Sequence, residues 1–320
     1  MNKRTVVYQS SSYIGAAHMK ANKPLQDASD SFIMDDYIVL LSLDGLGASS
    51  HSDAAAGEIK SYVRETLSQI STDFCRFSDE IMESVLKLCV HSVYKRFTSN
   101  HTEDLDDYLS TLDIVALNPY TRNLYFFHSG DGGIVVRRST GEYELITEEL
   151  RPENAPSNYV YPFTSKKWIF GIKKGVSSAM AITDGVLDIV NQELLNYTGK
   201  NKAVYIPLCA AILEPILVPR NNESYQNRIM SILADKEIPA KVLNHYTRVF
   251  SKRIENRLIN DFLASINDDM TIASVVIIDK ELINNNLMPV NYYIEPDWEK
   301  LSKKRDEDIQ SRIKRFNQKS

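Results

Sequence analysis

The sequence predicts an α+β fold in which antiparallel sheets are covered by helices. Short apolar runs typical of buried strands come first, two segments with helical spacing follow, and further strands, helices and a final strand complete the order. Because strands and helices do not alternate strictly, this order favours antiparallel sheets over a doubly wound parallel sheet. With 43% hydrophobic and 25% charged residues, the 320-residue chain can also bury a sizeable core, which excludes disorder throughout.

The strands are expected where apolar runs end at turn-forming residues. The run Tyr37–Leu43 is long enough for a buried strand and stops at Asp44-Gly45. The same reasoning predicts further strands at Phe32–Met34, Leu112–Leu117, Leu124–His128, Ile134–Arg138, Ala179–Thr183 and Met270–Ile278. Because a short glycine-rich segment joins Leu124–His128 to Ile134–Arg138, we expect these two strands to form a hairpin.

The helices are expected where apolar residues recur every three or four positions. One begins near Ser52, with Ile59, Val63 and Leu67 on one face, and a second covers about residues 79–98. Residues 186–266 have a mostly helical pattern. The polar tail from residue 283 carries a thin apolar stripe over 298–316, which is typical of a solvated helix.

Composition and charge exclude several classes of protein. The chain has 37 Lys and Arg against 42 Asp and Glu, and its net charge of −5 argues against a nucleic-acid partner bound by bulk charge. No segment approaches the roughly 18 uncharged apolar residues of a membrane span, and no apolar segment typical of a secretory signal follows the N-terminal Lys and Arg. Three cysteines without a CxxC motif fit a cytoplasmic protein with reduced thiols.

Five aspartates stand at the ends of predicted strands. Asp44 and Asp184 each follow a strand and precede a glycine, Asp27 and Asp268 each precede a strand, and Asp131 lies between two strands. A single Asp-Gly pair is ordinarily a turn. Strand ends can converge on one rim, however, and carboxylates packed together repel unless a cation lies between them. Hard divalent cations prefer such oxygen ligands, so the pattern indicates two-metal activation of water for an in-line displacement.

Other phosphate chemistries lack their motifs in this chain. There is no GxxxxGK[ST] phosphate-binding loop, no calcium-binding loop and no kinase catalytic loop. The segment that begins at Asp44 also lacks the second Asp two residues on that an aspartyl-phosphate enzyme would need.

The order of several short motifs resembles a known family. The motifs are Gly15…His18-Met19…Asn22-Lys23-Pro24-Leu25-Gln26-Asp27-Ala28, Leu43-Asp44-Gly45-Leu46-Gly47-Ala48-Ser49…Ser52-Asp53, Ser129-Gly130-Asp131-Gly132, Thr183-Asp184-Gly185-Val186-Leu187-Asp188 and Asn267-Asp268-Asp269-Met270-Thr271. Together they resemble the metal-dependent protein phosphatases of type 2C, and above all their bacterial branch. The motifs extend from about residue 15 to residue 278, which is most of the chain.

The resemblance implies a four-layer α-β-β-α sandwich of two antiparallel sheets flanked by helices. It also implies hydrolysis of phosphoserine or phosphothreonine in proteins, by water activated at a centre of two or three Mn²⁺ or Mg²⁺ ions. The catalytic domain would cover residues 1–282, with a helical insertion or flap within about 190–266. Residues 283–320 would form a polar tail whose solvated helix leaves room for a protein partner. Such an enzyme would be a cytoplasmic signalling protein that needs neither nucleic acid nor membrane.

The resemblance also assigns metal ligands. Asp44 would bridge both metals, and Gly45 would offer its backbone carbonyl. Asp184 and Asp268 would hold one of the two metals. Asp131 would belong to the optional third-metal site.

Three positions bear on water activation and proton transfer. Asp27 would lie in the outer shell and orient water, whereas Gln26 stands where many family members have Glu and is a poorer ligand than a carboxylate. Leu46 replaces a His that some members use as a general acid. His18 and His51, or water at the metal, are therefore the candidate proton donors.

The phosphate-binding group also differs from the family pattern. Asn22 lies near the position of an Arg that binds phosphate in many members, so Lys20, Lys23 or His18 would supply the positive charge. Two alternatives stay open. One is a catalytically weak regulatory or binding module with the phosphatase fold, which the departures at Asn22, Gln26 and Leu46 favour. The other is a hydrolase of a small phosphorylated molecule.

Overall fold

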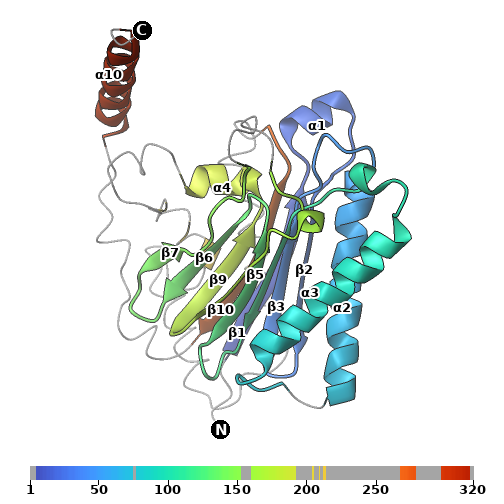
Figure 1. Ribbon diagram of the computed structural model, residues 1–320. Helices are drawn as coiled ribbons and strands as arrows, with labels where there is room; N and C mark the ends of the chain where they lie inside the picture. Colours follow the sequence, from blue (N-terminus) through green and yellow to red (C-terminus); the bar gives the residue numbers. More distant parts are fainter. Residues whose placement is uncertain are drawn as a thin grey trace.

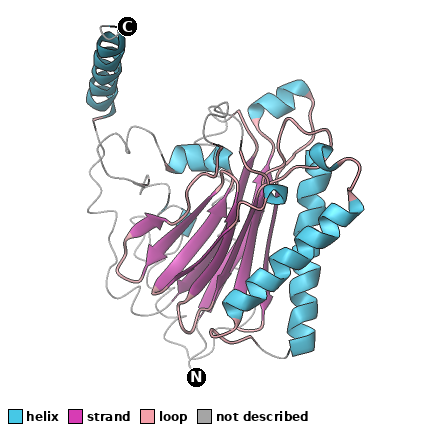
Figure 2. Cartoon of the chain, viewed as in Figure 1, coloured by secondary structure: helices cyan, strands magenta, loops and turns pink. Residues whose placement is uncertain are grey.

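The strands of the protein form two antiparallel five-stranded sheets flanked by helices (Figures 1 and 2). The computed structural model describes residues 5–74, 77–152, 160–191, 204, 209, 212–213, 267–278 and 297–317. The first sheet has the order β1 (Thr5–Tyr13), β10 (Met270–Ile278), β9 (Val176–Ile182), β6 (Gly133–Arg138) and β7 (Tyr143–Leu145). The second has the order β2 (Ala28–Met34), β3 (Tyr37–Leu43), β4 (Leu112–Leu117), β5 (Leu124–Ser129) and β8 (Ile169–Lys173). This architecture confirms the predicted α+β sandwich of two antiparallel sheets.

An apolar layer fills the space between the two sheets. Leu40 of β3 and Val115 of β4 belong to one buried cluster with Val275 of β10 and Ile134 of β6. Alternate residues of each strand face this layer, because successive side chains of a strand point to opposite faces. The layer holds the two sheets face to face and leaves their ends free to carry polar residues.

Two long helices cover the outer face of the second sheet. In Figure 1, α2 (Ser52–Phe74) and α3 (Met82–Asn100) lie beside β2 and β3. Ile59, Val63 and Leu67 of α2 are completely buried in the cluster that also contains Leu41 of β3. Since β3 is thus covered on both faces, its residues read as a continuous apolar run, as predicted.

The predicted hairpin between β5 and β6 is wrong. β5 pairs with β4 and β8 in the second sheet, whereas β6 pairs with β7 and β9 in the first. The glycine-rich segment therefore carries the chain from one sheet to the other, and Gly130 adopts a φ of 124° that favours glycine. As a result, Asp131 lies at the crossover between the sheets.

The sequence pattern did not delimit some elements that frame the site. β1 pairs with β10 along its whole length, from Thr5 opposite Ile278 to Tyr13 opposite Met270. Its apolar pattern is broken because residues 9–12 are polar. The helix α1 (Ala16–Ala21) that follows has only six residues, too few to show a helical period.

The segment after β9 is described only in part. Helix α4 (Asp184–Val190) opens it and agrees with the predicted helical pattern. Most of residues 190–266 lie outside the described part of the chain, so the insertion or flap stays a prediction. The same holds for the boundary at residue 282.

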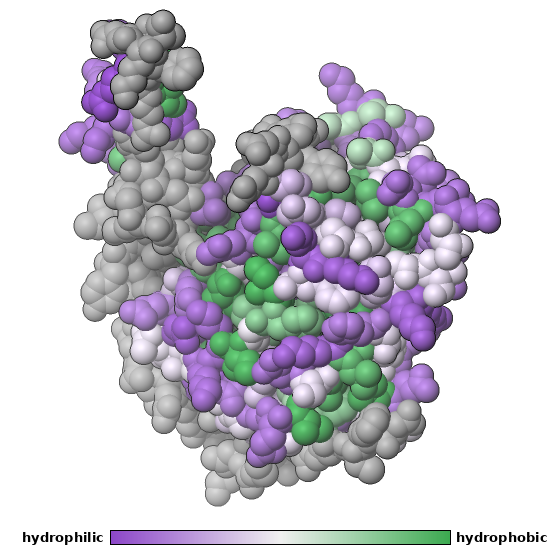
Figure 3. Space-filling model, in the orientation of Figure 1, coloured by the Kyte–Doolittle hydropathy of each residue, from purple (hydrophilic) through white to green (hydrophobic). Residues whose placement is uncertain are grey.

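The predicted tail helix is present as α10 (Trp298–Asn317). It stands apart from the two sheets in Figure 1, and the residues it shows in Figure 3 are mainly hydrophilic. Its side chains Ile309 and Ile313 are 45% and 47% exposed. Among the described helices, α10 included, none is both long enough and apolar enough to cross a membrane.

Replacing Leu41 with Ala tests the packing of the buried cluster between the second sheet and helices α2 and α3. Leu41 is completely buried, so the truncation should lower the free energy of unfolding by about 2–5 kcal/mol, measured by urea denaturation. As a control, Ile33→Ala removes a side chain that is 61% exposed and should change that free energy by less than about 1 kcal/mol. Equal effects of the two substitutions would contradict this packing.

Candidate functional site

Three aspartates from distant parts of the chain meet at one end of the sandwich. Asp44 directly follows β3, Asp131 lies in the crossover between the sheets, and Asp184 opens α4. One carboxylate oxygen of each lies within 4.8 Å of those of the other two. Asp131 is buried, while Asp44 and Asp184 are half-buried. The structure therefore brings together three of the acids that the sequence singled out, which we call the acid cluster.

Backbone contacts fix the position of Asp44. Its N–H donates to Thr111 Oγ1 over 2.9 Å, and its carbonyl oxygen accepts from the Thr111 N–H over 2.8 Å. The next residue, Gly45, has no room for a side chain, since a Cβ there would lie 2.5 Å from the Ser52 carbonyl oxygen and 2.7 Å from that of Gln26. The chain is thus held on both sides of the Asp44 carboxylate.

Burial and mutual repulsion disfavour the charged forms of these acids. Burial and then repulsion from Asp131 and Asp268 raise the pKa of Asp184 to about 7. Burial raises the pKa of Asp131 to about 6. The pKa of Asp44 is raised well above its usual value by burial and then by repulsion from Asp27 and Asp184. A cation placed among the carboxylates would relieve this repulsion.

Several buried oxygens around the acid cluster have no hydrogen-bond donor among the described residues. They are Asp131 Oδ1, Asp27 Oδ1 and Gln26 Oε1. Leaving a buried acceptor without a partner costs about 1–3 kcal/mol, so such oxygens indicate a site for a further group. A set of carboxylate and amide oxygens suits a hard divalent cation such as Mg²⁺ or Mn²⁺, and the residues present therefore fit the implied metal.

Asp268 lies near the acid cluster but outside the group of three. It precedes β10, and its Oδ1 accepts a hydrogen bond of 2.9 Å from the N–H of Asp269. Its charge contributes to the raised pKa values of Asp44 and Asp184. The ligand roles of Asp268 and of the Gly45 carbonyl therefore stay predictions.

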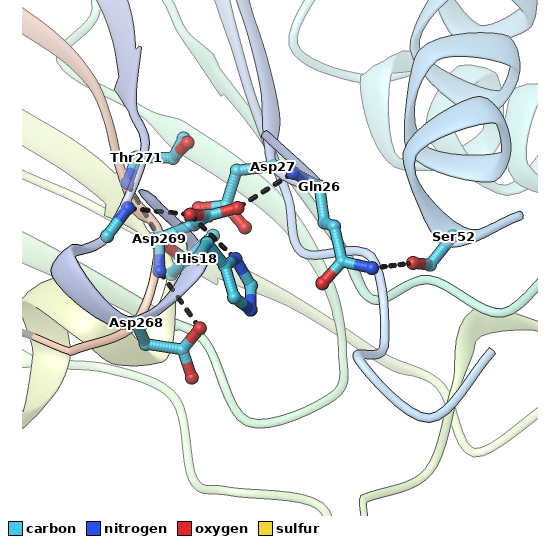
Figure 4. Close-up of polar contacts among 9 residues, drawn as sticks. His18, Gln26, Asp27, Ser52, Asp268, Asp269 and Thr271 are labelled. Carbon is cyan, nitrogen blue, oxygen red and sulfur yellow. Dashed lines mark hydrogen bonds and ion pairs between the residues drawn. The ribbon is translucent and has the colours of Figure 1, made fainter. Parts of the chain in front are cut away.

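Asp269 is the centre of a buried network that sequence reasoning did not single out as part of the site. Its side chain is 1% exposed. Oδ1 accepts from the Gly15 N–H over 2.7 Å, and Oδ2 accepts from the Gln26 N–H, also over 2.7 Å (Figure 4). His18 Nδ1 lies 2.9 Å from Oδ1. One carboxylate thus fastens the entry of α1 and the segment before β2 to the start of β10.

Asp27 and Gln26 lie in the same buried region, and Figure 4 shows both beside Asp269. Asp27 Oδ2 accepts from Thr183 Oγ1 over 2.8 Å, which places it next to the segment that begins with Asp184. Burial and then repulsion from Asp269 and Asp184 raise the pKa of Asp27. Gln26 Nε2 donates to Ser52 Oγ over 2.6 Å, which fixes the amide and leaves its oxygen without a described donor.

The predicted phosphate-binding residues lie at the end of α1. Asn22 caps this helix in the left-handed conformation, with a φ of 53°. Lys20, Asn22 and Lys23 are all exposed. Among the described residues, the structure shows no direct contact between them and the acid cluster, so their role stays a prediction.

The two histidines proposed as proton donors differ in surroundings. His18 is largely buried against Asp269, whereas His51 is exposed and its ring lies 4.9 Å from that of Tyr108. The 2.9 Å approach of His18 Nδ1 to Asp269 Oδ1 does not have hydrogen-bond geometry, so this nitrogen is buried without a hydrogen-bond partner among the described residues.

Sequence reasoning also missed a cation at the acid cluster. Arg151 Nη2 lies 3.3 Å from Asp131 Oδ2, and Arg151 Nε donates to Glu149 over 2.8 Å. Its charge opposes the rise in the pKa of Asp131 that burial causes. Because Arg151 comes from a loop with no periodic pattern, its sequence position gave no signal of this contact.

Comparison with known protein families agrees with this geometry. A family model described as "Protein phosphatase 2C" matches residues 14–233, which is more than half of the chain. The chain belongs to the protein phosphatase 2C family. The match includes Asp27, Asp44, Asp131 and Asp184. Membership in this family supports a protein phosphatase function.

Solved structures of other family members and relatives share the fold. The serine/threonine phosphatase Stp1 from Staphylococcus aureus is 12% identical, with a TM-score of 0.53 over 87% of this chain and 98% of its own. A bacterial serine phosphatase is 13% identical, with a TM-score of 0.52, and the match covers 85% of this chain and 98% of that protein's chain. PppA of Pseudomonas aeruginosa is 14% identical, with a TM-score of 0.50, and the match covers 85% of this chain and 98% of that protein's chain. At these identities the likeness shows the fold alone. Among curated proteins, none matches the sequence.

Asp269→Asn tests the buried network. The amide has only one acceptor oxygen, so either the Gly15 or the Gln26 N–H would face an NH₂ group and lose its partner. We expect the free energy of unfolding to fall by about 1–3 kcal/mol in chemical denaturation. Asp104→Asn, at an exposed loop position, is the control and should have little effect. A fully stable Asp269→Asn variant would contradict the network.

Asp184→Asn tests the repulsion within the acid cluster. Because the pKa of Asp184 is raised above its unfolded value of about 3.8, the folded state binds more protons between pH 4 and pH 7. The metal-free protein should therefore lose stability as the pH rises through this range. Asp184→Asn should remove much of that loss and raise the free energy of unfolding at pH 8 by at least about 1 kcal/mol. Thermal denaturation in chelator from pH 5 to pH 8 measures both effects, and a variant less stable than wild type at pH 8 would refute the repulsion.

Proposed function

We propose that the protein hydrolyses phosphoserine and phosphothreonine in proteins with the help of two or three Mn²⁺ or Mg²⁺ ions. The observation that carries the proposal is the convergence of three carboxylates within 4.8 Å of one another in a family of protein phosphatases. Asp44, Asp131, Asp184, Asp268 and the Gly45 carbonyl would hold the ions, and the Gln26 amide oxygen would be a weaker ligand. Bound ions would supply a water of lowered pKa and neutralise the phosphoryl oxygens.

The residues around the acid cluster would position the reacting groups. Asp44 is held by both of its backbone hydrogen bonds to Thr111, so its carboxylate would be presented to bound ions from a fixed backbone. Asp27 is fixed through Oδ2 by Thr183, and its free Oδ1 can accept a hydrogen bond from the attacking water. Rigid placement of this kind aligns a water for in-line attack on phosphorus.

His18 is the proposed proton donor for the leaving group. Its Nδ1 lies against Asp269, so Nε2 is the nitrogen left to donate a proton. Lys20 and Lys23, with the amide of Asn22, would attract the phosphate at the exposed end of α1. Each lysine ammonium would act as a point charge, whereas an arginine guanidinium can donate two parallel hydrogen bonds. An exposed arrangement of this kind suits a phosphorylated segment of a protein. A protein partner at α10, where Ile309 and Ile313 are exposed, belongs to the same proposal.

Activity measured with an aryl phosphate and Mn²⁺ tests the chemistry. Wild type should hydrolyse the ester, a chelator should abolish the reaction, and Asp44→Asn should lower kcat about 100-fold or more because the central carboxylate is lost. Asp104→Asn, a change of the same kind at an exposed position, is the control and should leave kcat unchanged.

The outcomes separate the remaining alternatives. Loss of activity in chelator and in Asp44→Asn would support an enzyme, whereas an inactive wild type would favour a regulatory module with this fold. With an active wild type, phosphoserine and phosphothreonine peptides should be better substrates than phosphorylated metabolites. The reverse preference would indicate a hydrolase of small molecules.

A further inference from the structure

A buried acid and histidine lie directly beneath the acid cluster and have no part in the chemistry proposed above. Asp113 of β4 and His128 of β5 are paired across the two strands, and they are 3% and 0% exposed. His128 Nδ1 lies 2.6 Å from Asp113 Oδ1. Val115 and Phe126, two residues further along the same strands, belong to the apolar layer between the sheets. The pair thus occupies the boundary between that apolar layer and the acid cluster.

The geometry fixes how many protons this pair shares. His128 Nε2 lies 2.8 Å from the carbonyl oxygen of Glu148, so both ring nitrogens face oxygen acceptors. A neutral imidazole has a single N–H, and the second contact needs one more proton, either on the ring or on the Asp113 carboxyl. In both cases Nε2–H donates to Glu148, and the pair carries no net charge. Repulsion from the Asp113 carboxylate is still one of the smaller causes that raise the pKa of Asp131.

This hydrogen bond fastens one end of a short segment, residues 148–151, which we call the strap. Further along the strap, the N–H of Leu150 donates to the Gly130 carbonyl oxygen over 2.7 Å. At its end, Arg151 Nη2 lies 3.3 Å from Asp131 Oδ2. The strap therefore runs along the crossover that carries Asp131 and contacts it at two points.

The other oxygen of Asp113 supports the same crossover from beneath. A Cβ at Gly132 would lie 2.7 Å from Asp113 Oδ2, so the backbone next to Asp131 rests on this carboxyl group. The pair thus reaches both the strap, through His128, and the crossover, through Asp113. Asp131 lies between these two supports.

We propose that Asp113 and His128 are positioning residues that hold Asp131 in the acid cluster, by fastening the strap and supporting the crossover. The inference rests on the proposed function insofar as Asp131 is a metal ligand. Groups behind a metal ligand commonly change metal affinity by about 10–100-fold when they are removed. A pair with a merely structural role would change stability without changing metal affinity.

Three variants of the full chain separate these roles. Asp113→Val combined with His128→Phe removes the pair without leaving a lone buried charge. Asp113→Asn is the conservative variant, since its amide can donate to Nδ1 while Nε2–H still donates to Glu148. Val115→Ala is the matched control, because it destabilises the same strand two residues away in the apolar layer.

Two measurements are made on each variant. Hydrogen–deuterium exchange of the peptide covering residues 148–151 reports on the strap without metal, and calorimetric titration with Mn²⁺ reports on metal affinity. The double variant should exchange at least about tenfold faster in the strap and bind Mn²⁺ at least about tenfold more weakly at one site. Asp113→Asn and Val115→Ala should stay within about threefold of wild type in both measurements.

Each other outcome overturns a defined claim. Unchanged strap exchange in the double variant, or an equal change in Val115→Ala, would overturn the positioning role. Faster strap exchange with unchanged Mn²⁺ affinity would overturn the link from the pair to metal binding. A wild type that binds no Mn²⁺ would instead overturn the metal chemistry of the proposed function, and strap exchange alone would then decide whether the pair positions the crossover.

Discussion

Repulsion among the carboxylates of Asp44, Asp131 and Asp184 is the force that the surrounding structure has to oppose. One oxygen from each lies within 4.8 Å of the others, in a region where burial weakens solvation. Carboxylates in this position would move apart on a flexible loop. They stay together because Asp44 follows a strand, Asp184 opens a helix, and Asp131 lies in a short crossover between two packed strands.

The supports of the acid cluster come from both sheets. Asp44 is held through Thr111 at the start of β4, within the second sheet. Asp269, at the start of β10 in the first sheet, binds the backbone of Gly15 and Gln26 and so joins the start of α1 to the segment before β2. The space between the sheets is apolar, so polar groups gather at the sheet ends, where the acids lie.

The sequence alone was sufficient to predict those features of the fold and the site that depend on a local residue pattern. The apolar run of β3 identified a buried strand, and the spacing of Ile59, Val63 and Leu67 identified the buried face of α2. Aspartates at strand ends marked candidate ligands because a strand end is visible in the sequence. Asp44 and Asp184 were found in this way, and the structure brings them together.

Features that depend on pairing between distant segments were not visible. The glycine-rich crossover resembles a hairpin turn locally, and only the partners chosen by β5 and β6 show that it joins two sheets. Asp269 stands in one of the motifs, but its bonding role was not visible because its partners lie more than 240 residues away in sequence. Arg151 and the pair of Asp113 with His128 likewise acquire their roles only from packing in three dimensions.

The pairing of β1 with β10 has a consequence for biosynthesis. β1 leaves the ribosome well before its hydrogen-bonding partner β10, which emerges only after more than 250 further residues have been made. Until then the nascent chain exposes an unpaired strand edge, which is prone to associate with other chains. Asp268 and Asp269 emerge with that same late strand. The buried network around Asp269 is therefore completed only after β10 has been made, long after the segments that it holds together.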